Sequence, residues 1–330
     1  MTSRFGNFVP DPNAAVDLDR RMRRELGESL AYVCEQSAGI VPFDEAAMKA
    51  LTDGLKAGKR YRASAFADYY ELAAALFDDD IDTAAARFNH IKDTEILPAG
   101  LPRFAPLGST AIGEESERYR LMMERDAESD LGIIYASDAQ IAHFHGRYER
   151  GVKLMEQAVP ELRGEYEALV SELVPVAGDR TRTMQFDGGS HYRLWGALFL
   201  NTDFHQTPHS IVEVIAHEAG HSFLFSHCIE ENLVRNTREQ RFASPLRVEP
   251  RPMEGIYHAT FVSARMHYAM SRVIAANVLD GEARAAAEQA MKDDVANFNS
   301  GYKVVEAHAN LTDTGRKLMD GALTYMRTAA

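Results

Sequence analysis

Two histidines four residues apart constrain this chain more than any other feature of its sequence. His217 and His221 flank Glu218 in the segment His-Glu-Ala-Gly-His, and Thr207-Pro208 upstream is typical of a capped helix start. On a helix this spacing brings both imidazoles to one face, about 6 Å apart along the axis. Such a pair can bind one divalent ion, and Glu218 can reach a water on that ion. The sequence therefore predicts a metal site anchored by His217 and His221.

The alternative is a pair of core histidines that hydrogen-bond to their neighbours. The helix that carries them is apolar on most of its surface. Burying two imidazoles and a carboxylate in such a helix costs free energy unless a ligand compensates for the lost water. We therefore prefer the metal site.

Most of the first half of the chain has the apolar period of an α-helix. We expect helices over residues 14–35, 44–55, 63–78, 129–157 and 161–173. A run rich in proline and glycine over residues 96–106 predicts a loop, after which helices resume near Glu115. We therefore expect a helical region over residues 1–175 and a metal-binding catalytic region over residues 176–330. We expect the two regions to pack together as one unit.

The character of the chain changes near Pro175, where strands are expected. Residues 181–186 predict a short strand that ends in the turn Asp187-Gly188-Gly189, and residues 192–200 predict a second strand. These two form the one sheet that we expect. The predicted fold class is mainly α, with a small β-sheet beside a zincin-like HExxH helix.

Composition excludes several classes of function. The net charge of -13 argues against nucleic acid, which needs a surplus of lysine and arginine. No apolar run is long enough for a membrane span or a signal peptide. Cys34 and Cys228 are too few for a disulfide scaffold, so we expect two reduced thiols. A cytoplasmic enzyme with a small-molecule or peptide substrate is expected; its oligomeric state stays open.

The third metal ligand is not His227, although it lies six residues after His221. A histidine at this spacing needs a glycine turn where this chain has Leu224. If the helix continues, His227 is displaced about 9 Å along the axis. We interpret it as a surface or cap histidine.

A helix expected over residues 252–279 supplies better candidates. On it Glu254, His258, Phe261 and Arg265 share one stripe. Glu254 would complete the two-histidine, one-carboxylate ligand set of a zinc peptidase or of a non-haem iron enzyme. His258 would instead give a metal site with three nitrogen ligands. A salt bridge between Glu254 and Arg265 is the structural alternative.

The block over residues 242–265 resembles the one that follows the metal helix in the HEXXH-motif peptide-modification family, also called the α-ketoglutarate-dependent HExxH enzymes. The matching features are Ser244-Pro245, Arg251-Pro252, Gly255 three residues before His258, and Ala264-Arg265. Residues 196–200 and 311–315 are also similar to family segments, so the resemblance covers roughly residues 185–318.

Membership would imply an iron(II) dioxygenase that uses 2-oxoglutarate to hydroxylate an unactivated carbon, often the β-carbon of a residue in a peptide. The implied iron ligands are His217, His221 and His258, and Glu218 would orient a ligand or the substrate. A 2-oxoglutarate site also needs a cation for the distal carboxylate, and arginine pairs with carboxylates in a bidentate way. The candidates, in order of preference, are Arg265, Arg251 and Arg247.

Two other hypotheses stay open. In a zinc peptidase, Glu218 would activate a zinc-bound water, and Glu254 or His258 would be the third ligand. A non-catalytic helical metal-binding protein would instead have a closed site with four ligands.

Overall fold

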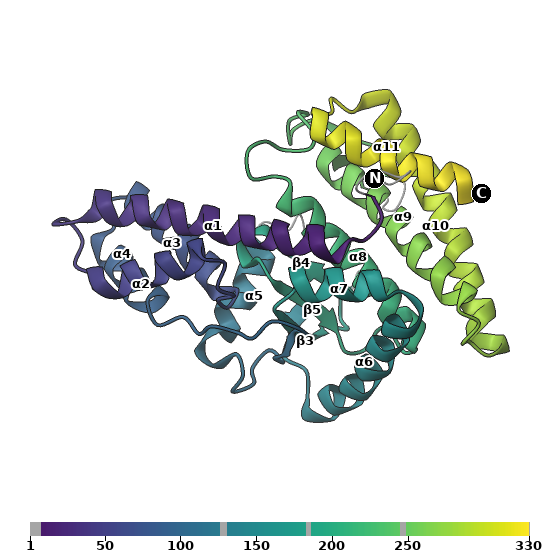
Figure 1. Cartoon of the computed structure of the whole chain (residues 1–330), viewed down its shortest axis with the longest axis horizontal. Helices are drawn as coiled ribbons and strands as arrows, with labels where there is room; N and C mark the ends of the chain where they lie inside the picture. The colour runs from purple at the N-terminus through teal and green to yellow at the C-terminus, as the bar shows by residue number, and fades with distance from the viewer. Residues whose placement is uncertain (1–7, 126–130, 183–185, 245–248, 330) are drawn as a thin grey trace. The chain divides into compact units, whose positions relative to one another are not determined.

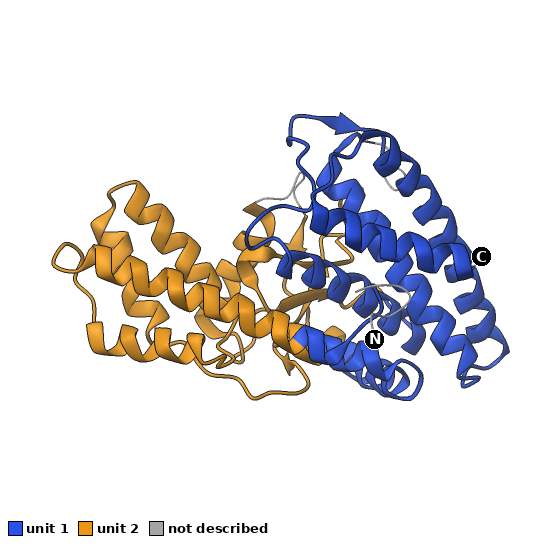
Figure 2. Cartoon of the chain, turned by 45° about the horizontal axis from the view of Figure 1, so that its top comes forward, with its two compact units in different colours: residues 1–15, 142–166, 205–330 blue, residues 16–141, 167–204 orange. Residues whose placement is uncertain are grey.

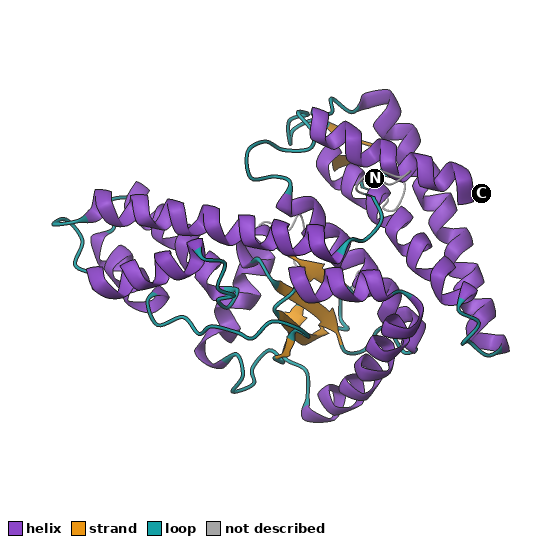
Figure 3. Ribbon diagram, in the orientation of Figure 1, coloured by secondary structure: helices purple, strands orange, loops and turns teal. Residues whose placement is uncertain are grey.

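The computed structural model describes residues 8–125, 131–182, 186–244 and 249–329. Helices dominate these residues and a small sheet accompanies them, which confirms the predicted mainly α class (Figure 3). Along the chain the longer helices, labelled in Figure 1, are α1 (Pro12–Ser37), α2 (Glu45–Lys56), α3 (Ser64–Phe77), α4 (Ile81–Ile91), α5 (Ser116–Arg125), α6 (Asp138–Ala158), α7 (Pro160–Leu169), α8 (Pro208–Ser226), α9 (Met253–Ala275), α10 (Gly281–His308) and α11 (Asp313–Ala329).

The chain divides into two compact units, each assembled from separated segments (Figure 2). Unit 1 contains residues 1–15, 142–166 and 205–330, and unit 2 contains residues 16–141 and 167–204. The boundary expected at residue 175 lies inside unit 2. The HExxH helix belongs to unit 1 and the larger sheet to unit 2.

The sheet of unit 2 has the strand order β1-β3-β5-β4, with β2 paired to β3. Strand β3 runs parallel to both β1 and β5, whereas β4 is antiparallel to β5 and β2 is antiparallel to β3. Buried side chains from β3 and β5 pack with residues of α3 and α5 into one apolar cluster. The strands are β1 (Arg103–Phe104), β2 (Ile133–Ile134), β3 (Glu172–Gly178), β4 (Gly188–Ser190) and β5 (Ala197–Asn201).

Strand β3 corrects the expected helix over 161–173, which ends at Leu169. Every residue of β3 is buried, and the strand lies inside the sheet with a partner on each side. A short, continuous apolar run of this kind cannot be distinguished from a buried helix by its period. Gly188 and Gly189 lie in strand β4 rather than in a turn. The strand expected over 181–186 falls largely on residues 183–185, outside the described residues.

Unit 1 is a helical assembly in which α9 packs against both α8 and α10. The contacts are close: a Cβ atom at Gly220 would lie 3.1 Å from Val262, and one at Gly301 would clash with Thr260. A second, two-stranded sheet pairs β6 (Arg241–Phe242) with β7 (Arg251–Pro252), just before α9 begins. Helix α9 ends at Ala275, before the expected end at residue 279.

Other expectations about the fold have clear outcomes. Helices α1, α2 and α3 confirm three of the predicted helices to within two residues at each end, whereas α6 begins only at Asp138, after strand β2. Cys34 and Cys228 are free thiols. Among the described residues, none of the helices is both long and apolar enough to cross a bilayer.

Candidate metal centre

The helix that carries the HExxH motif begins as the sequence predicts. Thr207 is the N-cap, and its hydroxyl accepts a hydrogen bond from the backbone N–H of Ser210, whose side chain accepts one from Thr207 N–H in return. Pro208 occupies the first turn, where its missing N–H costs nothing. The helix ends at Ser226 with His227 as C-cap, which confirms the cap assignment and removes His227 from the metal site.

One narrow stripe of α8 is accessible. Between Ile211 and Leu224 all residues are buried except Glu213, His217 and His221, which are partly exposed. These three are spaced by four and therefore share one face of the helix. The predicted metal ligands thus lie on the only open face of this part of α8.

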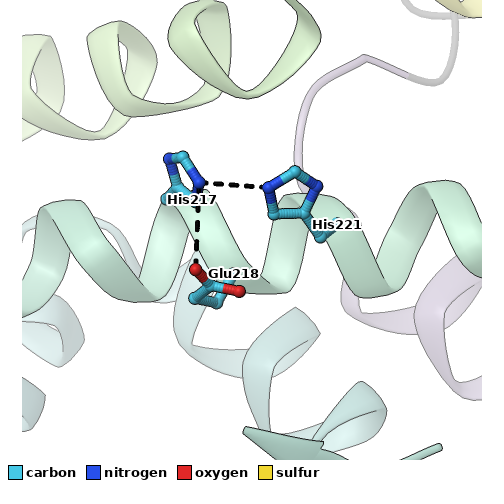
Figure 4. A group of neighbouring side chains, drawn as sticks. All are labelled: His217, Glu218 and His221. Carbon is cyan, nitrogen blue, oxygen red and sulfur yellow. Dashed lines mark hydrogen bonds and ion pairs between the residues drawn. The ribbon is translucent and has the colours of Figure 1, made fainter. Parts of the chain in front are cut away.

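The two histidines of the motif face each other. Their rings stand on the same side of α8 (Figure 4), and the two Nε2 atoms are 3.0 Å apart. Glu218 lies on the adjoining face and is 3% exposed, with Oε1 3.8 Å from Nε2 of His217. Ligand atoms of the three residues all lie within 4.8 Å of one another. A nitrogen pair with a buried carboxylate beside it suits a transition metal such as zinc or iron.

His258 comes to the same place from α9. Its Nδ1 atom lies 3.0 Å from Nδ1 of His221, and the two rings stack with centroids 5.3 Å apart. His221 therefore bridges two imidazoles, with Nε2 toward His217 and Nδ1 toward His258. The two nitrogens of one imidazole point in different directions, so a single ion binds only one of them. His258 is thus in contact with the motif, either as a ligand once the Nδ1 contact opens or as the group that orients His221.

Glu254, the alternative third ligand, does not join this group. Its side chain is 42% exposed and forms a long ion pair of 3.9 Å with Arg238. Among the described residues its other interaction is electrostatic, with the thiol of Cys228. Neither histidine of the motif is among these contacts, so the structure favours His258 over Glu254.

Arg265 lies in a closed environment instead of a ligand site. The guanidinium is 1% exposed and donates to Glu165 of α7, with Nη1 2.8 Å from Oε1. The rings of Phe8, Phe223 and Phe261 surround it, with centroids 4.7–5.6 Å from Cζ. This corrects the preference for Arg265 as the carboxylate-binding cation, because its charge is already paired inside an apolar shell.

Arg251 is the arginine beside the histidines. Its guanidinium rests against Gly255 in the first turn of α9, where a Cβ atom would lie 3.1 Å from Cζ of the arginine. Its charge is close enough to act on His221 and His258. In the sequence, the glycine four residues after Arg251 is the feature that indicates this close packing. Arg247, the remaining candidate, lies outside the described residues.

Burial and charge keep the inner imidazoles neutral. Burial lowers the pKa of His258 to about 4, and the charges of Arg251 and His217 act in the same direction. The pKa of His221 is held well below its ordinary value, first by burial and then by the neighbouring histidines and Arg251. Neutral imidazole is the form that binds metal.

Comparison with known proteins adds no relative. No protein-family model matches the chain, and no curated protein matches it. The geometry of the site therefore carries the functional argument.

Proposed function

We propose that this protein is an iron(II)- and 2-oxoglutarate-dependent hydroxylase that acts on a side-chain carbon of an amino acid or peptide. The observation that carries the proposal is the guanidinium of Arg251, which packs on Gly255 and lies close to His221 and His258, with His221 in contact with both His217 and His258. A metal-bound 2-oxoglutarate needs such a cation for its distal carboxylate. A peptidase does not.

In this proposal His217, His221 and His258 hold the iron. The bound iron and 2-oxoglutarate supply the oxidising chemistry, with decarboxylation to succinate and transfer of a hydroxyl to substrate carbon. Arg251 binds the distal carboxylate of 2-oxoglutarate and thereby fixes its orientation. Gly255 leaves the space that the guanidinium occupies.

Glu218 has an electrostatic role in this scheme. The carboxylate is almost completely buried and lies 3.8 Å from Nε2 of His217. A carboxylate at this place would stabilise the positive charge of the ion electrostatically.

A zinc peptidase is the second candidate, and the position of Glu218 favours it. A carboxylate beside the metal is where a general base for a metal-bound water is needed. The two candidates differ in what they require of Arg251, which has no defined part in peptide hydrolysis. The two candidates also differ in what they require of Glu218, because peptide hydrolysis needs its carboxylate as a general base.

One set of assays separates the candidates. Purified protein is supplied with iron(II), ascorbate, oxygen and 2-oxoglutarate, and succinate is measured. Zinc-loaded protein is tested in parallel for cleavage of a mixed peptide library. The hydroxylase predicts succinate from the first sample, a loss of roughly tenfold or more in 2-oxoglutarate affinity for Arg251→Gln, and an intact peptide library. Arg238→Gln is the matched control, because it removes the same charge from a side chain that is 74% exposed.

A further inference from the structure

A surface pocket of unit 1 has no part in the centre described above. Its volume is about 650 Å³, and it is formed by α6, by the start of α8 and by the segment that leads into α10. Pockets that bind small molecules have volumes of about 300–1,000 Å³. All of its lining residues belong to unit 1, and none of the three histidines of the metal centre is among them. The pocket is therefore a separate candidate site.

The part of the pocket that α6 forms is positively charged. Arg150 and Lys153, which we call the basic side, line the pocket and are exposed. Neither side chain forms an ion pair with a residue that the structure describes. Helix α8 begins at the same pocket, and its first turn has no acidic residue. The partial positive charge of this helix N-terminus therefore adds to the charge of the basic side.

The part that α10 forms is negatively charged. Asp280 and Glu282, which we call the acidic side, line the pocket and are exposed. Asp280 is the N-cap of α10, and its carboxylate accepts a hydrogen bond from the backbone N–H of Ala283. Within the described ranges, no ion pair joins the acidic side to the basic side or to any other residue. One pocket thus keeps two positive and two negative side chains apart.

A buried imidazole of the same pocket has an unused acceptor. His209 lines the pocket and is 6% exposed, and burial lowers its pKa, which favours the neutral ring. The hydroxyl of Thr207 donates to Oγ of Ser210, so it accepts a hydrogen bond from Nε2 of His209 at 3.1 Å. Nδ1 is then the acceptor of the ring, and it has no partner among the described residues. Such an atom costs free energy, which an N–H donor would offset.

We propose that this pocket binds a short peptide with a free N-terminus and a free C-terminus. The terminal carboxylate pairs with the basic side beside the start of α8, and the terminal ammonium group pairs with the acidic side. The amide N–H groups of the peptide supply the kind of donor that Nδ1 of His209 lacks. An extended tripeptide is roughly 10 Å long, which suits a pocket of this volume.

The remaining lining favours uncharged side chains on the peptide, because much of it is apolar, with Leu154 and Leu279 among its residues. The inference goes beyond the proposed hydroxylase and does not depend on it. His217 lies eight residues after His209, about 12 Å along the axis of α8. The peptide pocket and the metal centre therefore use different parts of one helix.

The test is binding of three probes that differ in single charges. They are trialanine, N-acetyl-trialanine, which lacks the ammonium group, and trialanine amide, which lacks the carboxylate. Isothermal calorimetry on the full-length protein, without added metal or 2-oxoglutarate, measures the three affinities. We expect trialanine to bind at least about tenfold tighter than either capped probe. No binding of trialanine, or equal affinity for all three probes, would overturn the inference.

Two double variants assign the two ends of the peptide, and each is the control for the other. Arg150→Gln with Lys153→Gln should erase the preference for trialanine over its amide and keep the preference over the acetylated probe. Asp280→Asn with Glu282→Gln should do the reverse, and asparagine at position 280 retains an oxygen for the helix cap. A double variant that keeps both preferences would contradict the proposed site.

A variant of the metal centre excludes binding at the histidines. His217→Ala removes a proposed metal ligand and should leave the affinity for trialanine unchanged, because His217 does not line the pocket. Loss of trialanine binding in this variant would place the peptide at the metal centre and overturn the inference. Trialanine binding by a protein that forms no succinate would refute the hydroxylase and leave the peptide pocket standing.

Discussion

The guanidinium of Arg251 rests on the backbone of Gly255, and a Cβ atom at this glycine would lie 3.1 Å from Cζ of the arginine. This distance is shorter than an ordinary contact, so a Cβ atom here requires the guanidinium to move by a few tenths of an ångström. Gly255→Ala therefore tests the position of the charge without removing it. We expect the KM for 2-oxoglutarate to rise roughly tenfold, with unchanged metal content. Gly146→Ala on α6 is the control, since a Cβ there meets only Arg150 at an ordinary 3.6 Å. If Gly255→Ala left the KM for 2-oxoglutarate unchanged, the result would contradict a role of Arg251 in binding this cofactor.

The third metal ligand is tested by a pair of variants on α9. His258→Ala removes the imidazole that contacts His221, and we expect it to lose most of its bound iron on dialysis. Glu254→Ala should keep a full equivalent, because this carboxylate is partly exposed and pairs with Arg238. Metal analysis of the two variants shows which of the two residues is the third ligand. The reverse pattern, with metal lost only from Glu254→Ala, would require a different ligand set.

Asp294 predicts an unusual dependence of stability on pH. Burial raises the pKa of this carboxyl to about 9, and the charges of Glu213 and Asp293 add to the shift. A carboxyl whose pKa is higher in the folded chain than in the unfolded one destabilises the fold increasingly as the pH rises from about 4 to about 9. The free energy of unfolding of Asp294→Asn should therefore exceed that of wild type by an amount that grows over this range, to about 1–3 kcal/mol. Urea denaturation at several pH values measures it, and a constant difference would contradict the assignment.

His90 in unit 2 predicts a second dependence of stability on pH, of the same sign, because its pKa is also higher in the folded chain than in the unfolded one. Its Nδ1 lies 2.8 Å from Asp68 and its Nε2 lies 2.6 Å from Glu115, and these two carboxylates raise its pKa to about 9. The protonated imidazole stabilises the fold fully below pH 6.5, and this contribution is lost as the pH rises through about 9. Because the side chain is 41% exposed, solvent screens the pair, and we expect only about 1 kcal/mol. His90→Gln should lose this amount near pH 6 and almost nothing at about pH 10.

The buried pair of Arg265 and Glu165 should matter for folding and not for the cofactor. Both side chains are 1% exposed, so removing one leaves an unpaired charge in an apolar shell. Glu165→Gln is expected to lower the free energy of unfolding by about 3–5 kcal/mol. The folded fraction should bind 2-oxoglutarate with wild-type affinity. Weaker 2-oxoglutarate binding by folded Glu165→Gln would restore Arg265 as a cofactor residue.

The parts of the site that follow from local rules could be predicted from the sequence. Thr207 and Pro208 fixed the start of α8, and the spacing of His217 and His221 fixed their common face. The proximity of His258 followed from the resemblance of its block to a known family. Its contact with His221 depends on how α9 packs against α8, which no local pattern specifies.

Long-range contacts explain the errors. Arg265 shares a stripe with His258, as its spacing requires, but it lies two turns further along the helix, where Glu165 and three aromatic rings enclose it. The helix expected over 161–173 includes the first two residues of strand β3, because a fully buried strand has no alternating pattern that marks its start. The importance of Asp294 was invisible in the sequence, since only the fold reveals that its Oδ2 is buried without a partner.

The most direct test of the account is the stoichiometry between 2-oxoglutarate consumed and succinate formed by iron-loaded protein in the presence of a mixed peptide library. The account predicts one succinate for each 2-oxoglutarate, with a hydroxylated peptide as co-product and no turnover in His217→Ala. Full metal loading without any succinate, together with peptide cleavage that depends on Glu218, would contradict it and identify a hydrolase.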